Sequence, residues 1–220
     1  MRELVDRAND VLERAELIDD GFSDLHAYRS LLLELNRRLP IELPPEQVRA
    51  ISIVRSATLR SAIGLAVAIL DPTDRRGNRA SLGHVLEALK DKAVADYLFS
   101  SDPRGRAKPI PERLNEVRTE YERIRSSPLL LRIKNLRHGK IAHLLTGVEP
   151  DRSVEYSDIF VLVDQIEKML VTLYEGFGMG PPHFLRLKER TSMDSNLFWY
   201  TYLAGAASAK ASDHLRSGKT

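Results

Sequence analysis

Cysteine is absent from the 220 residues of this chain. The absence excludes disulfide scaffolds, metal sites with thiolate ligands and cysteine nucleophiles. A chain without cysteine is easiest to reconcile with a reducing compartment, so we expect a cytoplasmic location. The N-terminus, residues 1–7, mixes charges of both signs and has no apolar core of the kind that a secretory signal requires. We therefore expect no export.

Long apolar runs and a strong charge of one sign are also missing. The most apolar stretch, residues 63–70, is far too short to cross a bilayer, so we interpret it as part of a core helix and expect no membrane contact. The 33 basic and 31 acidic side chains leave a net charge of +2. Affinity for nucleic acid would therefore have to come from local patches. No internal repeat, Gly-x-Ser-x-Gly elbow or paired-carboxylate motif stands out.

The residues that are present predict an all-α fold. Apolar positions recur every three or four residues along most of the chain, as in amphipathic helices. The periodicity of 156–174 also allows a buried strand, but its length favours a helix. Ser81 is placed to cap a helix, and the glycines between 176 and 180 indicate a hinge or turn. The predicted helices cover 4–18 with a continuation after Gly21 to Arg38, then 46–70, 81–100, 111–125, 128–145, 156–174 and 194–216.

These helices predict one helical-bundle domain over 1–220, built from about six or seven helices. Short connections favour antiparallel neighbours. We expect an N-terminal helical extension over 1–44, a core bundle over 45–175 and a C-terminal helix with a tail over 183–220.

The segment 136–144 places one arginine and two histidines inside what otherwise reads as a buried helix. An arginine there keeps its charge and needs a partner, which is either a carboxylate of the protein or the phosphate of a ligand. Imidazole can donate or accept a proton near neutral pH, and guanidinium can bind phosphate oxygens. Arg137 and His143 therefore have the chemistry that metal-independent RNA cleavage requires.

The spacing of these two residues affects how they could form a site. On an ideal helix, Arg137 and His143 lie about 9 Å apart along the axis and roughly 120° apart around it. They do not share a face. The long arginine side chain could partly close this gap, or a twofold axis could bring His143 of one subunit close to the pair of its mate. A composite site between two subunits is thus one alternative.

The same segment resembles the signature of the HEPN superfamily. That signature is an arginine, usually followed by a polar residue, with a histidine four to six positions later in a late helix of an all-α fold. Arg137, His138 and His143 match it, and the string 136–143 with its Ala-His ending is similar to the abortive-infection AbiU-like branch. The loop 78–82 is also similar to that branch. The family more often has asparagine or aspartate where this chain has His138.

The resemblance implies a homodimer with apposed motifs and a metal-independent endoribonuclease used in phage defence or as a toxin. Arg137 would contact phosphate and His143 would handle protons, with His138 and Lys140 as accessory residues and without a metal or other cofactor. The alternative is a non-catalytic module that binds a partner protein or a nucleotide. A third reading is a toxin that a cognate nucleotidyltransferase antitoxin holds inactive.

Each candidate residue also has a structural interpretation. Arg137 could form an ion pair with a glutamate of a neighbouring helix, and His143 could be a hydrogen-bonded interior histidine. His138 and His143 are five positions apart, which does not align two metal ligands on one face of a helix, so zinc is not expected. Two basic loops are candidates for RNA contact, although such loops are usually only solvated. Their basic residues are Arg75, Arg76, Arg79, Arg104, Arg106 and Lys108.

Overall fold

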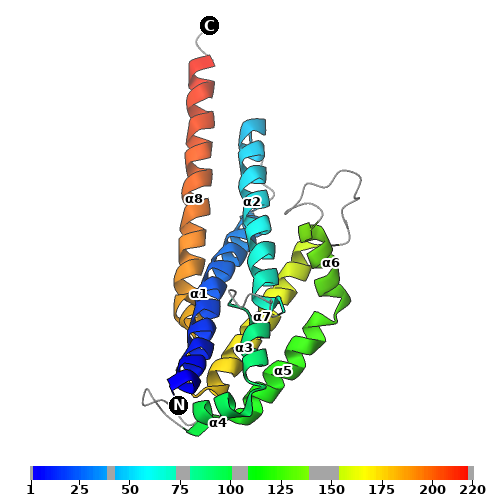
Figure 1. Cartoon of the computed structure of the whole chain (residues 1–220). Coiled ribbons are helices and arrows are strands. Elements are labelled where there is room, and N and C mark those ends of the chain that lie inside the picture. Colours follow the sequence, from blue (N-terminus) through cyan, green and yellow to red (C-terminus); the bar gives the residue numbers. More distant parts are fainter. Residues whose placement is uncertain (1, 39–42, 73–79, 101–108, 139–153, 218–220) are drawn as a thin grey trace.

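The computed structural model describes residues 2–38, 43–72, 80–100, 109–138 and 154–217, and within 206–217 it describes the backbone only. Over these residues the chain is all-α, which confirms the predicted fold class (Figure 1). The helices are α1 (Arg2–Arg38), α2 (Pro45–Leu70), α3 (Leu82–Ala88), α4 (Lys92–Ser100), α5 (Pro111–Arg125), α6 (Pro128–Leu136), α7 (Tyr156–Gly176) and α8 (His183–Ser217).

One cluster of buried apolar side chains joins α1 through α7 to the first turn of α8. The ring of Phe22 on α1 meets that of Phe184 on α8, with their centroids 4.6 Å apart. A smaller cluster of Leu35, Ile51 and Trp199 lies where α1, α2 and α8 extend beyond the main bundle. The indole N–H of Trp199 donates to the carbonyl oxygen of Leu31 at 2.9 Å, which fixes α8 against the end of α1.

Helix α1 continues through Gly21, so the predicted interruption of the first helix is wrong. Glycine in a helix interior costs roughly 0.5–1 kcal/mol relative to alanine. The neighbouring Ile18, Phe22 and Leu25 are all fully buried. Burial of such side chains contributes about 1.5–3 kcal/mol each, so tertiary packing outweighs the local cost of the glycine.

The predicted helix over 81–100 is two helices. Ser81 does cap the first, because its side chain accepts the backbone N–H of His84 at 3.3 Å. The chain then turns at 89–91, and the carboxylate of Asp91 accepts the N–H of Ala93 at 2.9 Å in the first turn of α4. A second local cap thus starts a second helix, which apolar periodicity alone does not reveal.

Helix α8 begins eleven positions before the predicted 194, and Asp19 of α1 explains why. The buried carboxylate of Asp19 accepts the backbone N–H groups of His183 at 2.6 Å and Phe184 at 3.1 Å, and the hydroxyl of Tyr174 at 2.9 Å. A negative charge at a helix N-terminus satisfies free N–H groups and complements the helix dipole. The cap comes from a residue more than 160 positions away in sequence.

Helix α2 supplies the apolar centre next to the candidate site. Among the described residues, it is the one helix whose length and composition would suffice to cross a membrane. Its C-terminal half instead lies in the bundle, where Ala62, Ile63, Ala66, Val67 and Leu70 are at most 1% exposed. The interpretation of 63–70 as part of a core helix is therefore confirmed.

Candidate functional site

Helix α6 carries the described part of the arginine motif. Its first turn is built from Ser127, whose side chain accepts the N–H of Leu130 at 3.1 Å, and from Pro128 at the first helical position. Leu130 and Ile133 are completely buried and anchor the helix in the main core. Arg137 and His138 follow in a wider π-type turn, and the description ends at His138. The motif arginine thus directly follows the last residue of α6, a helix that is anchored in the main core.

Arg137 has a protein carboxylate beside it. A guanidinium nitrogen of Arg137 lies 3.7 Å from Oδ2 of Asp71, the residue that ends α2, and Nζ of Lys134 lies 3.9 Å from the other oxygen. Both separations are longer than a charge-assisted hydrogen bond of 2.7–2.9 Å. The side chains of Arg137 and Lys134 are 36% and 33% exposed. Both cations therefore retain donors that a phosphate could reach.

The backbone of Asp71 is fixed from the opposite side. The hydroxyl of Tyr121 on α5 lies 3.4 Å from the carbonyl oxygens of Leu70 and Asp71. Burial raises the pKa of Tyr121 to about 12, so the phenol stays protonated and remains a donor. Gly83 leaves room for this contact, because a Cβ there would lie 2.3 Å from the Tyr121 oxygen. Asp71 is therefore a positioned residue and not part of a loose loop end.

The structure covers the predicted site only in part. Arg137 and His138 are described, and His138 is exposed. The remaining predicted residues lie outside the described ranges: Lys140, His143, Arg75, Arg76, Arg79, Arg104, Arg106 and Lys108. No group of three or more residues suited to hold a metal occurs among the described ones.

Two residues at the site were not predicted from the sequence. Neither Asp71, one position after the predicted helix over 46–70, nor Lys134 is among the predicted site residues. The carboxylate beside Arg137 is an aspartate at a helix end and not a glutamate on a helix face. The motif lies 66 positions after Asp71, so only the packing of α2 against α6 brings them together. The one signal was the Asp-Pro pair at 71–72, which fixes where α2 ends.

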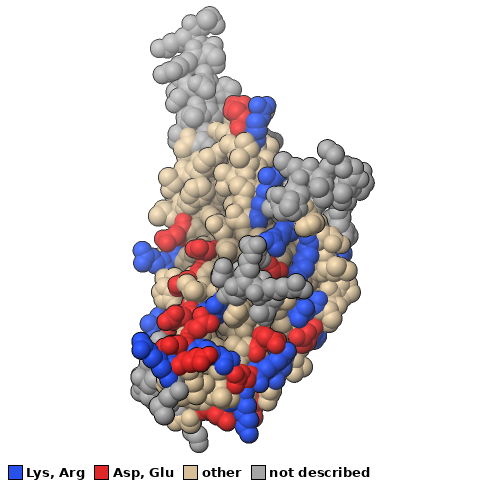
Figure 2. Space-filling model, in the orientation of Figure 1, with Lys and Arg blue, Asp and Glu red and all other residues tan. Residues whose placement is uncertain are grey.

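Charge is unevenly distributed around this site. Figure 2 shows Lys and Arg side chains over α2 and toward α6, with acidic side chains at the upper end of α2, whereas acidic and basic side chains mix over the lower part of the molecule. The guanidinium of Arg55 on α2 lies 4.3 Å from the ring centre of Tyr156, the first residue of α7. A basic surface of this kind favours a polyanion.

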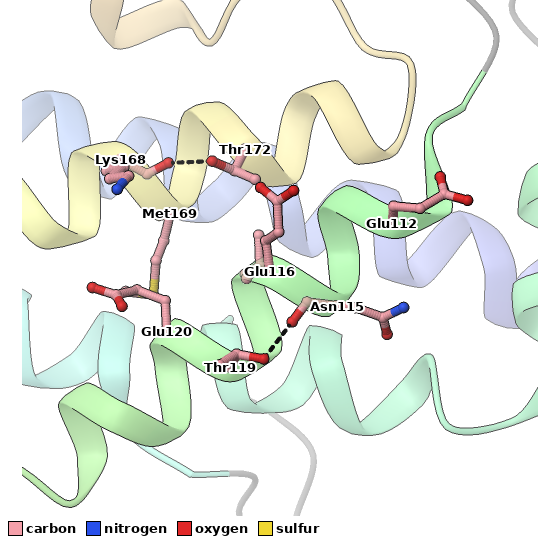
Figure 3. Close-up of a pocket in the computed structure, with 9 residues that line it drawn as sticks. Glu112, Asn115, Glu116, Thr119, Glu120, Lys168, Met169 and Thr172 are labelled. Atoms are coloured by element: carbon pink, nitrogen blue, oxygen red, sulfur yellow. Dashed lines mark hydrogen bonds between the residues drawn. The ribbon is translucent and has the colours of Figure 1, made fainter.

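A cavity of about 470 Å³ lies between α5 and α7, and its lining differs in charge from the basic surface near α2 and α6. Its lining includes Glu112, Glu116 and Glu120, spaced one helical turn apart along α5, with Lys168 facing them from α7 (Figure 3). Glu116 and Glu120 pair with Arg113 and Arg123 of the same helix, so the surroundings of this cavity are close to charge balance and offer a phosphate backbone little attraction. Size alone therefore does not make this cavity the RNA site.

Comparison with known families decides what kind of protein carries this arrangement. A family model described as AbiU2, of the HEPN type, matches residues 8–198, which is most of the chain. The chain belongs to the AbiU2 family of HEPN proteins. The match confirms the resemblance drawn from the motif, and it extends into the first and last helices. No curated protein and no solved structure matches this AbiU2 chain.

Membership of the AbiU2 family indicates the general function of the protein. This AbiU2 protein is an HEPN-type abortive-infection module, and its motif arginine lies at the end of α6 beside Asp71.

Proposed function

We propose that this AbiU2 protein is a metal-independent endoribonuclease that acts in phage defence. The supporting observation is Arg137, a permanently charged and partly exposed guanidinium at the C-terminal end of α6, within a chain of the AbiU2 family. In the proposed reaction, the 2′-hydroxyl oxygen attacks the adjacent phosphorus and the bond to the 5′-oxygen breaks. A cyclic 2′,3′-phosphate and a free 5′-hydroxyl result.

The two motif residues have separate tasks in this proposal. Arg137 binds the phosphate oxygens, whose negative charge grows as the fifth bond to phosphorus forms. His143 moves protons, either from the attacking hydroxyl or to the departing 5′-oxygen. We further propose a homodimer that brings two motifs together, because Arg137 and His143 of one ideal helix face different directions. The proposed location is the cytoplasm.

The ion pair of Arg137 also supports a second candidate function. Asp71 already compensates part of the charge of Arg137 and Lys134. In a non-catalytic module, the phosphate of a nucleotide or the carboxylate of a partner protein would replace Asp71 at these two cations. Such binding requires no further catalytic residue. This candidate predicts binding that depends on Arg137 and no RNA product.

Incubation of total RNA with purified protein in excess chelator distinguishes the two candidates. We expect the wild type to produce discrete fragments with 2′,3′-cyclic phosphate ends, and His143→Ala to produce none while its thermal midpoint stays nearly unchanged. Full activity of His143→Ala would disprove the assigned role. Lys92→Ala, an exposed substitution on α4, is a control for the effect of substitution itself. Absence of cleavage by the wild type would favour the binding module, or a toxin that a cognate antitoxin holds inactive.

A further inference from the structure

A cavity of about 260 Å³ lies between α3 and α5, next to the end of α2. Pro72, Leu86 and the ring of Tyr121 form its less polar walls. Its charged lining residues are Glu87 of α3, Lys90 of the turn that follows α3, and Arg118, Glu122 and Arg125 of α5. This α3–α5 cavity is therefore distinct from the cavity between α5 and α7.

The charges of this cavity do not cancel. Lys90 pairs with Glu87 at 2.5 Å, and Arg125 lies 3.6 Å from Glu122. Arg118 has no corresponding carboxylate among the residues that the structure describes. Its guanidinium cannot lose a proton, so the cavity keeps one uncompensated positive charge.

The Nε atom of Arg118 also lacks a partner, a feature that it shares with the Nε atoms of four other described arginines. It is shielded from solvent and has no hydrogen-bond partner in the described part of the chain. Buried donors are nearly always paired, because an unpaired one costs about 1–3 kcal/mol. An anion in the cavity would supply the missing negative charge to the terminal nitrogens of Arg118, which are not among its shielded atoms.

We propose that the α3–α5 cavity is a phosphate-binding subsite and that Arg118 is its principal ligand. The tetrahedral oxygens of phosphate match the planar fork of a guanidinium. The wall of the cavity also leads to the motif, because Tyr121 contacts the carbonyl oxygen of Asp71, whose carboxylate faces Arg137. On the proposed ribonuclease function, on which this step rests, the phosphate belongs to the RNA strand bound at Arg137. A free mononucleotide is the other source of the same group.

The test measures binding of a 12-nucleotide 2′-O-methyl RNA, which has no free 2′-hydroxyl and cannot be cleaved. Fluorescence anisotropy at several salt concentrations compares the wild type with Arg118→Gln. Arg123→Gln is the matched control, because Arg123 lies on the same helix but pairs with Glu120 at 2.5 Å and does not line the cavity. AMP is the second probe, and thermal midpoints show whether each variant is folded.

We expect Arg118→Gln to weaken RNA binding about tenfold. Its plot of log K against log salt should be less steep by about 0.7, the value for one lost contact to a single strand. Arg123→Gln should match the wild type. If the wild type binds RNA and Arg118→Gln binds it equally well, the subsite is wrong while the proposed function stands. Binding of AMP alone, dependent on Arg118, would support the subsite and count against the ribonuclease. Binding of neither probe would overturn both.

Discussion

Asp71 is the carboxylate that partly compensates the positive charge of the motif arginine. It lies 3.7 Å from Arg137 and 3.9 Å from Lys134, so it competes with any phosphate that approaches these two cations. Its backbone, at the end of α2, is held by the Tyr121 hydroxyl, which lies 3.4 Å from the Asp71 carbonyl oxygen. The proposed ribonuclease therefore has to displace an internal anion before it binds its substrate.

Replacement of Asp71 by asparagine should strengthen the binding of uncleavable RNA several-fold. Asparagine keeps the shape of the side chain but removes the competing charge. The Asp71 pairs are 3.7 and 3.9 Å long, and the two cations are about one-third exposed. Ion pairs of this kind contribute about 0–1 kcal/mol, so the free energy of unfolding should change little. Anisotropy with the 2′-O-methyl RNA measures the affinity. Asp96→Asn, an exposed substitution on α4, should leave it unchanged. Weaker binding by Asp71→Asn would show that Asp71 orients Arg137 instead of competing for it.

His26 is a buried titratable residue of α1. It is 5% exposed, and both of its ring nitrogens lack a hydrogen-bond partner among the described residues. Burial lowers its pKa below the ordinary value of 6.5, and the nearby Lys188 and Arg29 act in the same direction, against Glu167 and Asp164. The unfolded chain therefore binds a proton more readily than the folded one.

The free energy of unfolding should accordingly fall as the pH drops below about 6.5, the pKa of histidine in an unfolded chain. The fall should continue until the pH reaches the lower pKa of the folded state. His26→Leu cannot titrate and has a similar volume, so its contribution should not vary over this range. Urea unfolding at pH 7.5 and 5.5 tests this. Equal losses of stability on acidification in both proteins would contradict the assignment.

At the scale of elements, local sequence signals predicted starts of helices better than their continuity. Ser81 and the prolines at 45, 111 and 128 marked where helices begin, because caps and first-turn prolines act within a few residues. The continuity of α1 through Gly21 depends on burial, and the early start of α8 depends on Asp19. Neither contact between distant elements is visible in the pattern of one segment.

Asp19 is expected to be worth more to stability than any exposed carboxylate of α1. Asp19→Ala removes the cap of α8 and leaves the Tyr174 hydroxyl and two backbone N–H groups without their acceptor. Hydrogen bonds to a charged group contribute about 1.5–3 kcal/mol each, and they are not additive. We expect a loss of roughly 3 kcal/mol in the free energy of unfolding, measured with urea. The neighbouring Asp20, 71% exposed, is the control, and Asp20→Ala should change stability by less than about 0.5 kcal/mol. Equal effects would refute the capping role.

At the scale of the whole molecule, the fold class and the family could be predicted, whereas the surroundings of the motif could not. Helical periodicity is repeated in every segment, and the spacing of Arg137 and His143 is local, so both can be recognised in one sequence. Asp71 and the cavity around Arg118 arise from packing between elements far apart in the chain. The assembly of two chains is still further from what one sequence encodes in its local pattern, and it remains a proposal.

A heterodimer tests whether the proposed site is shared between subunits. Arg137→Ala and His143→Ala chains with different affinity tags would be expressed together, and the mixed dimer purified through both tags. If each site combines Arg137 of one subunit with His143 of the other, one of the two sites contains both residues. The heterodimer should then cleave RNA at about half the rate of the wild type, while both mutant homodimers are inactive. If each site uses residues of one chain, neither site of the heterodimer is complete and no cleavage follows. A mass measurement by light scattering, made on the same sample, shows that the inactive species is still a dimer.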